Sequence, residues 1–131
     1  MAEPSYRALI VDDEWTVRQL TRNALSRIGI DCHFAANGCQ ALESLKKSNY
    51  DVVITDLMMP DRNGHQLCLD LLARPDRPLI MVLTGVVDAK IATDLLKRGV
   101  DDVAFKPVDY YEFMAKVRTL LASREESPAA S

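Results

Sequence analysis

The stretch ALIVDDEWTVRQLTRNALSRI, residues 8–28, contains the pattern that decides the fold. Its first four residues, Ala8 to Val11, form an uninterrupted apolar run, which is typical of a strand buried on both faces. The apolar residues between Val17 and Ile28 recur at spacings of three and four, so they occupy one face of a helix. This stretch therefore predicts a buried strand followed by an amphipathic helix.

The same strand-and-helix unit recurs along the rest of the chain. Further strands are expected at 32–35, 52–54, 79–83 and 103–105, and helices at 38–47, 64–73, 88–98 and 110–122. Five such units favour the α/β class: a doubly wound, three-layer domain with a five-stranded parallel sheet covered by helices on both faces. In sheets of this kind, ligands bind outside the carboxyl ends of the strands.

Length and composition fit a single domain. The chain has 131 residues, of which 48% are apolar, enough for one hydrophobic core. We expect this domain to span residues 1–122. Residues 123–131, Ser-Arg-Glu-Glu-Ser-Pro-Ala-Ala-Ser, have little to bury and are interpreted as a flexible tail or the stub of a linker.

Charge and cysteine usage argue against several classes of protein. The net charge of -3 disfavours a nucleic-acid-binding surface on this domain, although a separate DNA-binding partner domain is compatible with it. No apolar run approaches the ~18 residues of a membrane span, and the N-terminus lacks the regions of a signal peptide. Cys32, Cys39 and Cys68 have no metal-site spacing and are expected to be reduced, mostly buried thiols. The sequence predicts a soluble, cytoplasmic protein.

Polar side chains follow the predicted strands, at the edge where such folds bind ligands. Taken singly, three of them have ordinary structural explanations. Asp13 could be the N-cap of the first helix, Thr84 an N-cap or turn residue, and Lys106 a solvated surface cation. Asp56, which ends a fully apolar strand, is harder to explain in this way. The whole set is Asp12, Asp13 and Glu14 after the first strand, Asp56 after the third, Thr84 after the fourth, and Lys106 with Pro107 after the fifth.

The carboxylates of this set predict a magnesium site. Crowded carboxylates repel one another unless a cation neutralises them, and Mg²⁺ prefers oxygen ligands in octahedral geometry. We expect Asp13 and Asp56 to bind the metal directly and Asp12 to bind it directly or through water. The backbone carbonyl of Met58 is the expected further ligand.

Phosphoryl transfer is the chemistry that such a site favours. A metal-bound Asp56 could attack an in-line phosphoryl donor, and the reaction asks the protein mainly for positioning and charge stabilisation. We expect Lys106 to hold one equatorial oxygen and the Thr84 hydroxyl another. The sequence therefore predicts that Asp56 is a reversible phosphoryl acceptor.

These residues resemble the receiver domain of a two-component response regulator. The resemblance covers about residues 5–122 and rests on five motifs in order. They are Asp12-Asp13-Glu14, Asp56-Leu-Met-Met-Pro60 with Gly64, Thr84-Gly85, Gly99-Val-Asp-Asp, and Lys106-Pro107. The resemblance implies a flavodoxin-like (βα)5 fold with strand order 2-1-3-4-5 and a cis peptide bond between Lys106 and Pro107.

The resemblance also implies a function in signalling. Asp56 would receive a phosphoryl group from a histidine kinase or a histidine phosphotransfer protein, with Mg²⁺ as the cofactor. Thr84 would then move toward the phosphoryl group and shift the face formed by the fourth helix, fifth strand and fifth helix. An output domain or partner protein would bind this face, which could also form a homodimer. The chain would not be an enzyme, beyond catalysing its own phosphorylation and dephosphorylation.

Two departures from the family pattern bear on how the signal is transmitted. Val103 stands where many receivers have an aromatic residue three positions before the lysine, and Val108 replaces the Phe common after the Lys-Pro pair. Two other functions are alternatives: a degenerate receiver that only binds partners, and an aspartyl-phosphate phosphatase of another α/β family. Such phosphatases need a second Asp two residues after the nucleophile, where this chain has Met58.

Overall fold

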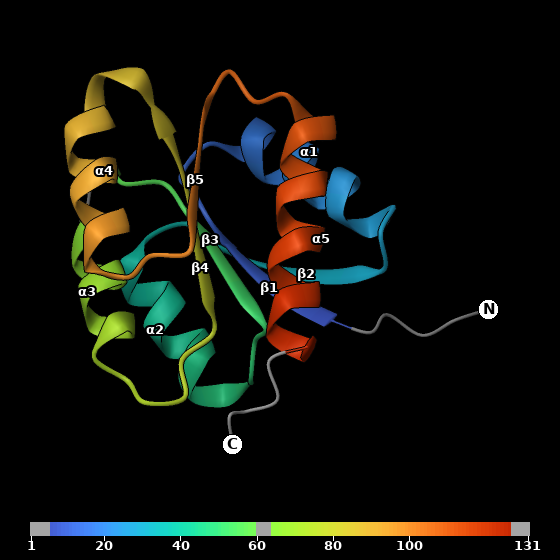
Figure 1. The fold of residues 1–131 in the computed structure, drawn as a ribbon, viewed down its shortest axis with the longest axis horizontal. Helices are drawn as coiled ribbons and strands as arrows, with labels where there is room; N and C mark the ends of the chain where they lie inside the picture. The colour runs from blue at the N-terminus through green and yellow to red at the C-terminus, as the bar shows by residue number, and fades with distance from the viewer. Residues whose placement is uncertain (1–5, 60–63, 127–131) are drawn as a thin grey trace.

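The computed structural model describes residues 6–59 and 64–126 of the chain. Strands and helices alternate along it, with one short 3-10 helix, η1, before the fourth α-helix (Figure 1). The elements are β1 (Tyr6–Val11), α1 (Trp15–Ser26), β2 (Ile30–Ala35), α2 (Gly38–Lys47), β3 (Val52–Thr55), α3 (Gly64–Leu72), β4 (Leu79–Gly85), η1 (Val86–Asp88), α4 (Ala89–Arg98), β5 (Asp102–Lys106) and α5 (Tyr110–Glu126).

The sheet has the predicted topology. Its five strands are parallel and lie in the order β2-β1-β3-β4-β5, which confirms the order implied by the resemblance. Helices α1 and α5 cover one face, and α2, α3 and α4 cover the other, so the domain has three layers (Figure 1). The carboxyl ends of all five strands therefore meet at one edge of the sheet.

Each central strand contributes to two hydrophobic cores. In β1, Leu9 and Val11 pack in the core under α2, α3 and α4, while Ala8 and Ile10 pack in the core under α1 and α5. Successive side chains of a strand point to opposite faces, so both sets must be apolar when helices cover both faces. This arrangement explains the runs of apolar residues without alternation that mark β1, β3 and β4 in the sequence.

Several boundaries differ from the predicted ones. Thr84 lies within β4, and Lys106 lies within β5, rather than after these strands. Helix α5 continues to Glu126, so residues 123–126 are helical rather than part of a flexible tail. Within this last turn, the Arg124 guanidinium donates hydrogen bonds to the carbonyl oxygens of Asp51 (3.1 Å) and Arg77 (2.7 Å), which ties it to the segments that precede β3 and β4. Residues 127–131 lie outside the described residues.

The cysteine prediction was correct in part. All three thiols are free, and Cys68 is buried, but Cys39 is exposed in the first turn of α2.

Of the helices in residues 6–59 and 64–126, none combines the length and hydropathy needed to cross a membrane.

Candidate functional site

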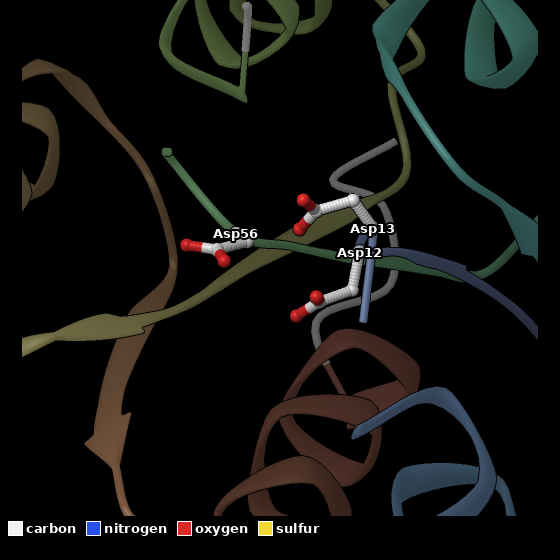
Figure 2. A group of neighbouring side chains, drawn as sticks. All are labelled: Asp12, Asp13 and Asp56. Carbon is white, nitrogen blue, oxygen red and sulfur yellow. The ribbon is translucent and has the colours of Figure 1, made fainter. Parts of the chain in front are cut away.

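The register of the sheet brings three aspartates together. Val11 at the end of β1 pairs with Thr55 at the end of β3, so Asp12 and Asp56 leave neighbouring strands at the same level. The Asp56 N–H also donates to the Val11 carbonyl oxygen (3.0 Å), which continues the ladder by one residue. Asp12, Asp13 and Asp56 each present a carboxylate oxygen within 4.8 Å of the others. Figure 2 shows these carboxylates directed to the same side of the sheet edge.

Asp13 is not the N-cap of α1, which was one explanation that the sequence offered for it. Helix α1 begins at Trp15, and the residue at its N-cap position is Glu14, whose side chain makes no capping hydrogen bond. The Glu14 N–H instead donates to Asp12 Oδ1 (2.9 Å). Asp13 therefore does not cap the start of α1, and its exposed carboxylate lies with the buried ones of Asp12 and Asp56.

Both carboxylate oxygens of Asp56 are held by donors. Lys106 Nζ donates to Oδ2 (2.9 Å), and the Thr84 hydroxyl (3.1 Å) and the Met58 N–H (3.3 Å) donate to Oδ1. The Asp56 side chain is nearly buried, with 8% exposed. Lysine, threonine and aspartate come from β5, β4 and the end of β3, and this convergence confirms that the three predicted residues lie together.

Lys106 is a half-buried ion-pair partner and not a solvated surface cation. Besides Asp56, its ammonium contacts Glu14 Oε1 (3.0 Å) and Asp12 Oδ2 (3.1 Å). Burial alone would lower the pKa of Lys106, but the hydrogen bonds to Asp56 and Glu14 and the charge of Asp12 outweigh it and raise that pKa. The peptide bond between Lys106 and Pro107 is cis, as the resemblance implied.

Asp12 provides the test of whether a cation fits this site. Its Oδ2 atom is buried and accepts no hydrogen bond from the described residues, because the nearby Lys106 ammonium meets it as an ion pair without hydrogen-bond geometry. Burial raises the pKa of Asp12, against the hydrogen bond from Glu14 and the charge of Lys106. A carboxylate that is costly to ionise, has only an ammonium beside its Oδ2 atom and lies next to two other carboxylates suits a hard divalent cation.

The loop after Asp56 packs closely against it. A Cβ atom on Gly64 would overlap the Asp56 carbonyl oxygen and lie 2.7 Å from the Leu57 Cα. Only glycine therefore fits at the start of α3 without displacing the backbone that carries Asp56. The Met58 side chain is 61% exposed at the rim of the site. Pro60, part of the motif noted in the sequence, lies outside the described residues.

The sequence did not predict two contacts of the site residues, those of Asp88 and Glu14. The Thr84 hydroxyl lies 3.1 Å from Asp56 Oδ1 and also 3.5 Å from Asp88 Oδ2 at the start of α4. Glu14 was noted only as part of a motif, yet its carboxylate bonds Lys106. The spacing of four between Thr84 and Asp88 was a weak signal, and nothing in the sequence connects Glu14 with a residue 92 positions away.

Val103, which stands where many receivers have an aromatic residue, packs in the hydrophobic core. Val103 is buried in the core under α2, α3 and α4, and the Lys116 ammonium of α5 donates to its carbonyl oxygen (2.9 Å). Phe105, two residues on, is 40% exposed on β5. Apolar side chains on η1 and α4 are also exposed, including Val87 and Ile91.

Comparisons of sequence and structure relate this chain to known response regulators. The family model for the response regulator receiver domain matches residues 8–118 of this chain. A protein named "Probable transcriptional regulator ycf27" from Porphyridium aerugineum is 36% identical over 115 residues, which cover 88% of this chain and 48% of that protein.

Two further relatives extend the comparison. The DNA-binding response regulator MtrA of Mycolicibacterium smegmatis is 34% identical over 123 residues, covering 94% of this chain and 54% of MtrA. The chain thus spans about half the length of these two curated relatives. The receiver domain of the Francisella response regulator 1452 superimposes with a TM-score of 0.83 at 28% identity, covering 92% of this chain and 99% of that one.

Proposed function

This chain belongs to the response regulator receiver domain family, a class of signalling modules in two-component systems, and we propose that Asp56 is its phosphoryl acceptor. The observation that carries the proposal is the set of donors on the Asp56 carboxylate. Lys106 holds one oxygen and Thr84 the other, beside two further aspartates. The phosphoryl donor in this proposal is a histidine kinase or a histidine phosphotransfer protein.

The proposed metal ligands are Asp12, Asp13 and Asp56, with the backbone carbonyl of Met58 as a fourth protein ligand. Mg²⁺ at this position would neutralise the carboxylates and stabilise negative charge on the transferring phosphoryl group. The buried Oδ2 atom of Asp12, which accepts no hydrogen bond from the described residues, and the short separation of the three carboxylates support this assignment.

The transfer itself exchanges one bond to phosphorus for another. A carboxylate oxygen of Asp56 forms a bond to phosphorus as the bond between phosphorus and the donor's imidazole nitrogen breaks, and the imidazole keeps the electron pair. The Lys106 ammonium then donates to a phosphoryl oxygen in place of the Asp56 carboxylate. The three acidic partners that surround the half-buried Lys106 ammonium support this role.

The readout of the phosphoryl group is assigned to Thr84. Its hydroxyl has one proton, and both Asp56 and Asp88 lie near enough to accept it. A phosphoryl oxygen on Asp56 would draw this hydroxyl away from Asp88, which stands at the N-cap of α4. The proposed signal therefore passes to the face formed by α4, β5 and α5, and Val103 takes no aromatic part in it.

The wider setting is also a proposal. The α4-β5-α5 face would bind an output domain, a partner protein or a second copy of this chain, and this domain would make no direct contact with nucleic acid. The three unpaired cysteines favour a cytoplasmic location, where thiols are kept reduced. Any catalysis is limited to the domain's own phosphorylation and dephosphorylation. An exposed Met58 in place of a second acidic residue gives no support for a phosphatase.

Intact-mass spectrometry tests the phosphoacceptor claim. The protein is incubated with acetyl phosphate in Mg²⁺ or in EDTA, and we expect the added mass of one phosphoryl group only in Mg²⁺. Asp56→Asn is the control and should stay unmodified. A protein that folds and binds Mg²⁺ but takes no phosphoryl group from any donor would be a degenerate receiver.

A further inference from the structure

Glu14 occupies the N-cap position of α1 without capping the helix. Its backbone is fixed on both sides, since its N–H donates to Asp12 Oδ1 (2.9 Å) and its carbonyl oxygen accepts from the Arg18 N–H (3.1 Å). Short polar residues are preferred at N-caps because they reach back to the first N–H groups of the helix. The longer Glu14 side chain reaches across the site instead, to Lys106 Nζ at 3.0 Å.

Glu14 differs from the other two partners of Lys106. An ammonium has three N–H donors, and in this structure three carboxylates surround it. Asp12 and Asp56 are buried, with 2% and 8% of their side chains exposed, and both belong to the acidic cluster. The Glu14 side chain is 59% exposed and lies outside that cluster. Of the three carboxylates around Lys106, it is therefore the one outside the acidic cluster.

The geometry points to a role for Glu14 in the proposed phosphoryl transfer: its carboxylate gives the Lys106 ammonium a partner at the open side of the site, so that the ammonium can shift from Asp12 and Asp56 when a divalent cation binds. This inference rests on the proposed function. Without Glu14, the remaining partners of Lys106 are Asp12 and Asp56, which are the carboxylates that a divalent cation needs. The ammonium would then compete with the metal and lie deeper than the incoming phosphoryl oxygens. Glu14 is thus a positioning residue that acts through Lys106.

Two variants separate the charge of Glu14 from its hydrogen bond. Glu14→Gln keeps an oxygen that can accept from Lys106 but removes the charge, whereas Glu14→Ala removes both. Glu43→Gln, on the exposed side of α2, is the control for net charge. Urea denaturation in EDTA establishes that each variant is folded.

Calorimetric titration of Mg²⁺ gives a readout that does not depend on phosphorylation. Removing one nearby negative charge would weaken the binding of a divalent cation by about two- to sevenfold, the lower value applying at physiological salt. We expect this loss in Glu14→Gln, at least as large a loss in Glu14→Ala, and none in Glu43→Gln.

Phosphorylation by acetyl phosphate at saturating Mg²⁺ then tests the position of Lys106. We expect Glu14→Ala to be slower than wild type by about tenfold, as for a misplaced catalytic group, and Glu14→Gln to retain most of the rate. Equal rates for the two variants, or Mg²⁺ affinities unchanged from wild type, would overturn the inference. If wild-type protein takes no phosphoryl group, the proposed function fails, and the Mg²⁺ affinities alone then decide whether Glu14 keeps Lys106 away from the metal position.

Discussion

Replacing Lys106 by methionine removes the cation that this acidic site uses when no metal is bound. Methionine has a similar length but no charge, so the buried carboxylates of Asp12 and Asp56 lose their partner. Breaking a buried ion pair from one side costs about 3–5 kcal/mol, because the remaining charge stays buried and uncompensated. For a domain of this size the melting temperature should fall by roughly 10–20 °C.

Urea denaturation in EDTA measures this cost, and a second series in Mg²⁺ tests its origin. Without the competing ammonium, the carboxylates of Lys106→Met should bind Mg²⁺ more tightly than those of wild type. A ligand at 100 times its Kd adds about 2.7 kcal/mol of stability, so the same Mg²⁺ concentration should stabilise the variant more than the wild type.

Lys116→Met provides the matched control. Lys116 is a partly exposed lysine of α5 that donates to a backbone oxygen and lies 4.0 Å from Asp102. Its loss should cost about 1 kcal/mol or less and should not change the response to Mg²⁺. Equal stability of Lys106→Met and wild type in EDTA would refute the view that Lys106 compensates the buried aspartates.

Three further predictions concern the same site. Thr84→Val should lower the free energy of unfolding by about 1.5–3 kcal/mol, because it removes a hydroxyl donor from the Asp56 carboxylate; an unchanged urea midpoint would contradict this. Gly64→Ala should cost about 1–3 kcal/mol and slow phosphorylation, since its Cβ overlaps the backbone of Asp56; a crystal structure with an unmoved Asp56 would count against it. Burial raises the pKa of Asp12 above 3.8, so the metal-free folded state holds a proton more tightly than the unfolded state. Relative to Asp12→Asn, the stability of the metal-free wild type should therefore rise as pH falls from neutral toward 3.8. Urea denaturation in EDTA at several pH values measures the difference in free energy of unfolding between the two proteins. A difference that does not change with pH would contradict this prediction.

The fold could be predicted because burial on both faces leaves a direct trace in the sequence. Strand residues such as Ala8 to Val11 must all be apolar when helices cover both faces of the sheet, and this produces runs that no surface strand shows. The site followed from the fold, since parallel strands place Asp12 and Asp56 at one edge whatever their side-chain conformations. Helix ends were less predictable: α5 continues to Glu126 because Arg124 finds backbone acceptors that are distant in sequence.

The contacts between site residues were beyond sequence reasoning for a different reason. Which carboxylates reach Lys106 depends on side-chain conformations at the ends of separate strands, and Glu14 looked like an ordinary member of an acidic run. Asp88 likewise meets Thr84 only because η1 turns the chain back beside the end of β4. The contacts of Glu14 with Lys106 and of Asp88 with Thr84 therefore become visible only in the three-dimensional structure.

Chemical trapping identifies the residue that carries the phosphoryl group. After incubation with acetyl phosphate and Mg²⁺, reduction with borohydride converts an aspartyl phosphate to homoserine, and peptide mass spectrometry locates it. If Asp56 is the phosphoryl acceptor, homoserine will form at position 56 alone, and none will form when Mg²⁺ is replaced by EDTA. Homoserine at Asp12 or Asp13 in place of Asp56, or labelling that persists in Asp56→Asn, would contradict it.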